Sequence, residues 1–146
     1  MLRKLMMALM PQKQMVKMAT IEFKSKRGIQ SIIDDVEAAC TEYKFALLHH
    51  YNYQEVVAQK GFPIDRKVHI YEVCQAKVAS MMLTSNPQFS PFMPCRIAVY
   101  EEGDATIIST QNMQMMINSI QDQEQLHVEA VGLFTALQLM MKKLKG

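Results

Sequence analysis

Alternation of hydrophobic and polar positions along the chain predicts strands in several short segments. The segments are residues 15–24, 45–52, 67–73, 95–101 and 105–110. The last two are separated only by the turn Glu102-Gly103-Asp104, which predicts that they form an antiparallel hairpin. The pattern therefore indicates about five strands.

Between these segments, apolar residues recur three and four positions apart, as on one face of a helix. The clearest case is residues 29–43, whose apolar stripe includes Ile32, Val36 and Cys40. Further helices are expected at 54–60, 76–84, 111–120 and 123–144, the last with a broad apolar stripe. The segment 87–94, PQFSPFMP, is expected to be an extended loop, because each residue before proline is disfavoured in a helix.

This order of elements predicts an α+β domain with a mainly antiparallel sheet of about five strands and helices packed on one face. A chain of 146 residues fits one domain. We divide it into an N-terminal extension (1–15), the α+β domain (16–120) and a C-terminal helix (121–146) that packs on or extends the same domain.

Composition narrows the classes of function. A net charge of +2 and the lack of a basic stripe interleaved with aromatics argue against nucleic-acid binding. Three cysteines without CxxC spacing argue against a disulfide framework and favour the cytoplasm. No segment has the length of a membrane span. The segment MLRKLMMALM at residues 1–10 has helical apolar spacing, so it is either a loosely docked extension or a peripheral contact with a partner or membrane surface.

The candidate site lies around the third and fourth strands. Alternation places Glu72 and Cys74 on one face of the third strand, together with Val68 and Ile70, and leaves His69, Tyr71 and Val73 on the other face. We take the Glu72 face as the apolar one. On the fourth strand Cys95 shares a face with Ile97 and Val99, opposite Arg96.

Whether Glu72, Cys74 and Cys95 meet depends on strand direction. If the two strands are antiparallel neighbours, the three side chains converge near the proline-rich loop. If the strands are parallel, the two thiols lie about 20 Å or more apart. The 19 residues from 75 to 93 allow either connection, and we favour the antiparallel one.

Several kinds of chemistry fit this set of residues. Glu72, Cys74, Cys95 and one histidine would make a plausible zinc site, although their spacing is not diagnostic and His69 points away from Glu72. Arg96 would instead pair with Glu72 around the strand edge. In a further alternative, Glu72 lies at a frayed or exposed strand end or bonds to backbone N–H groups of the proline-rich loop, and both cysteines are core residues. A cysteine nucleophile requires a positioned base and an oxyanion site, and the sequence identifies neither.

Two segments, VHIYEVCQAKVASMML and MPCRIAVYEEGDATII, resemble a bacterial and archaeal family, the domain of unknown function 302. The resemblance covers roughly residues 16–120 and implies a TATA-binding-protein-like arrangement: strand, helix, four strands, helix. It also implies a homodimer. Glu72, Cys74, Pro94, Cys95 and Arg96 match the recurring residues of the family, whereas Gln75 replaces its usual asparagine.

The leading functional hypothesis is a non-enzymatic dimeric module that binds a small ligand or metal through Glu72, Cys74, Cys95 and Arg96. One alternative is a thiol enzyme or sulfur carrier that uses Cys95 or Cys74. Another is a structural or interaction domain whose final helix docks on a partner. The sequence identifies no cofactor.

Overall fold

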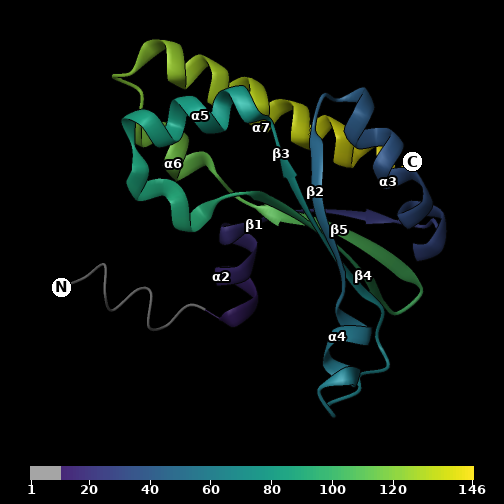
Figure 1. Cartoon of the computed structure of the whole chain (residues 1–146). Coiled ribbons are helices and arrows are strands. Elements are labelled where there is room, and N and C mark those ends of the chain that lie inside the picture. Colours follow the sequence, from purple (N-terminus) through teal and green to yellow (C-terminus); the bar gives the residue numbers. More distant parts are fainter. Residues whose placement is uncertain (1–10) are drawn as a thin grey trace.

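The computed structural model of the chain describes residues 11–146 and contains one antiparallel sheet (Figure 1). The predicted amphipathic segment at residues 1–10 lies outside the described residues. The five strands are β1 (Thr20–Ser25), β2 (Ala46–Asn52), β3 (Val68–Cys74), β4 (Cys95–Glu102) and β5 (Ala105–Gln111). Their order across the sheet is β1-β5-β4-β3-β2, and every neighbouring pair is antiparallel. The predicted fold class is confirmed.

Helices lie before, between and after the strands. They are α2 (Gln12–Ala19), α3 (Ile29–Glu42), α4 (Tyr53–Gln59), α5 (Ala76–Ser85), α6 (Gln114–Ser119) and α7 (Glu124–Lys145), with a 3-10 helix η1 at Pro87–Phe92. Helices α3, α5 and α7 gather on one side of the sheet, whereas α4 lies at the far end of β2 and β3 (Figure 1). We call the sheet face beneath α3 and α7 the covered face and the opposite one the open face.

The hydrophobic core fills the space between the covered face and these helices. Helix α7 contributes its whole apolar stripe, including Leu137, Met140 and Met141, all fully buried. From α3 the buried residues include Ile32, Val36 and Cys40. Burial raises the pKa of the Cys40 thiol, with a smaller contribution from Glu37, so Cys40 is a core residue, as its place on the apolar stripe indicates.

Two sequence-based expectations are wrong. Residues 15–19 belong to helix α2 and not to a strand, because β1 can pair with β5 only from Thr20, which lies opposite Gln111 at the end of β5. The segment 87–92 is a 3-10 helix and not an extended loop. Pro87 is tolerated there because the first positions of a helix need no N–H donor.

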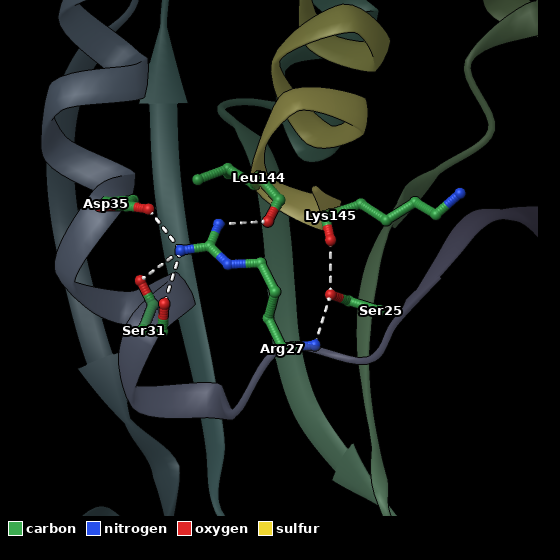
Figure 2. A network of polar contacts seen from close by, with 6 residues as sticks. All are labelled: Ser25, Arg27, Ser31, Asp35, Leu144 and Lys145. Carbon is green, nitrogen blue, oxygen red and sulfur yellow. Dashed lines mark hydrogen bonds and ion pairs between the residues drawn. The ribbon is translucent and has the colours of Figure 1, made fainter.

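A network around Arg27 joins the last turn of α7 to α3 and to the end of β1 (Figure 2). The guanidinium donates to the backbone carbonyl of Leu144 at 2.8 Å and to the Asp35 carboxylate at 2.5 Å. The Ser25 hydroxyl donates to the carbonyl of Lys145 at 2.6 Å. The last carbonyls of a helix lack partners within the helix, so these donors cap α7.

Candidate functional site

The sheet register separates Glu72 from Cys95. Strands β3 and β4 are antiparallel neighbours, as predicted, and Glu72 pairs with Arg96 while Val73 pairs with Cys95. The covered face of β3 carries His69, Tyr71 and Val73, all buried. The expectation that Glu72 lies on the core side is therefore wrong, because it lies on the open face, whereas the face assigned to Cys95 is correct.

Glu72 has charged and aromatic neighbours on the open face. Its carboxylate lies 3.6 Å from the guanidinium of Arg96, which is half exposed. On the other side, Glu72 lies opposite His49 of β2, and a hydrogen bond to Glu72 raises the pKa of the nearby Tyr51 hydroxyl. Glu72 is thus a paired side chain on a partly solvated sheet face, as in the alternative that the sequence left open.

Both thiols lie at the same end of the sheet, beside a cavity. The cavity has a volume of about 70 Å³, and almost all of its lining is apolar. Cys74 enters it from the end of β3 and Cys95 from the start of β4, while α5, η1, α6 and α7 supply the rest of the wall. The antiparallel pairing of β3 and β4 is what brings the two cysteines to one place.

Sulfur is the recurring chemical element of this cavity. Besides the two cysteines, its walls contain four methionines and two phenylalanines: Met82, Met93, Met113, Met116, Phe89 and Phe92. The Cys95 thiol donates a weak hydrogen bond to the Met113 thioether, with 3.9 Å between the two sulfur atoms. We call this space the sulfur-lined cavity.

The environment of Cys95 suppresses its thiolate. Burial, followed by the neighbouring Cys74, raises the pKa of Cys95 to about 11. The thiolate is the nucleophilic form of cysteine, and reactive cysteines have a lowered pKa. The site therefore lacks the activation that nucleophilic catalysis by Cys95 requires at neutral pH.

A histidine pair on the covered face was missed from the sequence. The Nε2 atom of His50 lies 2.8 Å from the Nδ1 atom of His69, so one ring donates a hydrogen bond to the other. His50 also stacks on Tyr71, with the ring planes inclined by 10°. Burial lowers the pKa of both histidines. The pair depends on a β-bulge between Leu47 and His49, which sequence alternation does not reveal.

Tyr71 lies next to this pair and, with buried His69 and the more exposed His50, forms a polar cluster at the edge of the core. Its hydroxyl is buried and has no hydrogen-bond partner among residues 11–146. Burial raises its pKa to about 12. A neutral tyrosine and two neutral histidines are thus the stable forms of this cluster near pH 7.

Among residues 11–146, no three side chains of the histidine, cysteine, aspartate and glutamate types gather as metal ligands would. Glu72 in particular lies across the sheet from the sulfur-lined cavity. Of the helices in this part of the chain, none combines the length and apolar character needed to cross a bilayer.

Comparison with known proteins identifies the family and a structural relative. The family described as "Domain of unknown function DUF302" matches residues 21–144 and so takes in α7, beyond the 16–120 of the sequence resemblance. The chain is similar to an uncharacterized conserved DUF302 protein from Bacillus stearothermophilus, whose crystal structure superposes with a TM-score of 0.74 at 23% identity. The similarity covers 86% of this chain and 97% of that one. No curated protein matches the chain.

Proposed function

The chain belongs to the DUF302 family, whose name assigns no activity, and from that premise we propose that it is a non-enzymatic module that binds a small ligand in the sulfur-lined cavity. The observation that carries this proposal is an apolar cavity of about 70 Å³ that both Cys74 and Cys95 line. Ligand sites are typically concave and mostly apolar, with few polar groups. The size of the cavity limits the ligand to a few atoms.

A binding role is favoured over the thiol-enzyme alternative by the state of Cys95. Its pKa of about 11 leaves little thiolate at neutral pH, and among residues 11–146 the only side chain within its hydrogen-bond reach is the thioether of Met113. A thioether is neither a base nor an oxyanion donor. A catalytic Cys95 would require both, so catalysis has no support from this geometry.

Binding is favoured over the docking of α7 on a partner because of where the apolar stripe of α7 lies. Its large side chains, among them Leu137 and Met140, are in the core of this chain. The apolar residues of α7 that remain exposed are Val128, Val131 and Leu139. A few exposed apolar side chains are ordinary on the solvent side of a helix in a globular protein.

Xenon tests the proposal directly, because it is an apolar probe of atomic size that enters dry cavities. The protein is labelled at its methionine methyl groups and followed by NMR as xenon pressure rises. The expected result is a saturable shift of the Met82, Met113 and Met116 methyl signals. The signals of Met140 and Met141, which are buried away from the cavity, should stay in place.

A cavity-filling variant supplies the control. Ala130→Leu places a larger side chain in the wall of the cavity and should abolish the xenon shifts, whereas Ala58→Leu, on the exposed side of α4, should leave them unchanged. If xenon leaves all methionine signals unshifted in the wild-type protein, the space is closed to ligands and the proposal is overturned.

We also propose that two copies of the chain associate through the open face. This face carries half-buried apolar and aromatic side chains, among them Val68, Ile70 and Tyr100, and the helices that gather on the sheet among residues 11–146, α3, α5 and α7, lie on its other side. Interfaces are rich in tyrosine and arginine, and Arg96 also lies on this face. Light scattering coupled to size exclusion should give the mass of a dimer for the wild type and of a monomer for Ile70→Lys. A monomeric wild type would contradict the proposed dimer and would leave the proposal of ligand binding in the cavity unaffected.

A further inference from the structure

The two sulfur atoms of Cys95 and Met113 have the spacing of neighbouring ligands around one ion. We propose that the ligand of the sulfur-lined cavity is a soft monovalent metal ion of the Cu(I) class, bound by Cys95 and Met113 with Cys74 as a third sulfur ligand. This inference rests on the proposed function of the same cavity and names its ligand. It replaces the carboxylate-containing metal set expected from the sequence.

The distance between Cys95 Sγ and Met113 Sδ is 3.9 Å. With metal–sulfur bonds of about 2.3 Å, two sulfurs around a three-coordinate ion lie about 4 Å apart. The ion would take the place of the proton that Cys95 now shares with Met113. The two side chains would hardly have to move. Cys74, at the end of the neighbouring strand, lines the same cavity.

The donor set selects the class of metal. Thiolate and thioether ligands select soft ions such as Cu(I), whereas carboxylates and water suit hard ions. The cavity wall contains six sulfur residues, and the acidic and histidine side chains of residues 11–146 form no ligand group with the cysteines. Methionine is flexible, so Met93 and Met116, also in the wall, offer replacement donors.

The lining of the cavity also suits Cu(I). Its walls are almost entirely apolar and include Phe89 and Phe92 of η1. An apolar, sulfur-rich lining limits the access of water as a competing ligand. Binding is a ligand exchange without electron transfer: the S–H bonds of Cys95 and Cys74 break, two S–Cu bonds form, the Met113 thioether donates a lone pair, and two protons leave to solvent. Copper enters and remains as Cu(I).

Cu(I) itself is the probe in the test. Under anaerobic conditions the full-length protein is titrated with Cu(I) in competition with a chromogenic chelator, and native mass spectrometry gives the stoichiometry. One ion per chain is expected, with loss of one proton for each coordinating thiol. Cys95→Ser and Met113→Leu should each weaken the affinity by more than about tenfold. Met141→Leu and Cys40→Ala, which remove buried sulfur elsewhere, should leave it within about twofold.

A second measurement reports directly on the methionine that binds the ion, without a competing chelator. Ag(I), a stable surrogate for Cu(I), should shift the Met113 methyl signal and leave that of Met141 in place. Equal Cu(I) binding by wild type, Cys95→Ser and Met113→Leu, or an unshifted Met113 signal, would overturn the inference. If xenon still enters the cavity in that case, the proposed binding function stands and its ligand is an apolar molecule. If xenon also fails to enter, both proposals fall.

Discussion

The guanidinium of Arg27 donates to the backbone carbonyl of Leu144 at 2.8 Å, across 117 positions of sequence (Figure 2). The same side chain bonds to Ser31 and Asp35 of α3. One arginine therefore fixes the last turn of α7 to α3, near the point where the Lys143–Glu42 ion pair joins the same two helices. Charge-assisted hydrogen bonds of this type are among the stronger ones in proteins.

Arg27→Ala should lower the free energy of unfolding by about 1–3 kcal/mol, since it removes charged hydrogen bonds from a helix end where residues 11–146 offer no other donor to the Leu144 carbonyl. Chemical denaturation with urea measures the change. Lys26→Ala, on the exposed neighbouring residue, is the matched control and should change stability by less than about 0.5 kcal/mol. Equal effects of the two substitutions would contradict the anchoring role of Arg27.

Alkylation should distinguish the cysteines by their environment. Cys95 should react with iodoacetamide far more slowly than a free thiol at pH 8, because its pKa is about 11 and its thiol is inside the cavity wall. The rate should rise with pH toward that value as the thiolate fraction grows. Mass spectrometry of digested protein gives the rate at each cysteine, with the urea-unfolded chain as the reference. A rate at Cys95 equal to the unfolded rate would be incompatible with this environment and would revive the thiol-enzyme alternative.

The His50–His69 pair should make stability fall in mild acid. Burial lowers the pKa of both histidines below the ordinary value of 6.5, so the unfolded chain binds more protons than the folded one below that pH. Stability from the neutral pair is fully present above pH 6.5 and is lost as pH falls from 6.5 through the folded-state values. Protonation also places two N–H donors face to face across the 2.8 Å contact.

Thermal unfolding between pH 7.5 and 5 measures this dependence. His69→Gln should reduce the slope of stability against pH, whereas His127→Gln, on the outer part of α7, should leave it unchanged. The pair would not be the source of the pH dependence if both variants kept the wild-type slope.

The Glu72–Arg96 pair should contribute little to stability. The two groups are 3.6 Å apart and Arg96 is half exposed, so a double-mutant cycle with Glu72→Gln and Arg96→Met should give a coupling of about 0–1 kcal/mol. Because both lie on the open face, neither substitution should alter xenon entry. Loss of xenon binding in Glu72→Gln would place Glu72 in the ligand site after all.

Local pattern alone determined the order of strands and helices. Alternation and helical spacing depend only on which residues must be hidden from water, so they identified the stripe of α3, the stripe of α7 and the β4–β5 hairpin. Cys95 was assigned to the correct face of β4 for the same reason, since Ile97 and Val99 leave no doubt about which face is apolar.

Tertiary structure decided the rest. Strand β3 carries large side chains on both faces, Ile70 on one and Tyr71 on the other, so its own pattern does not specify which face the helices cover. The register with β4 and the bulge in β2 fixed that choice; they placed Glu72 opposite Arg96 on the open face and His50 against His69 on the covered one. The contact between Cys95 and Met113 depends on how α6 packs after β5. Periodicity reports burial within a segment, whereas contacts between distant segments are set by how the elements pack together.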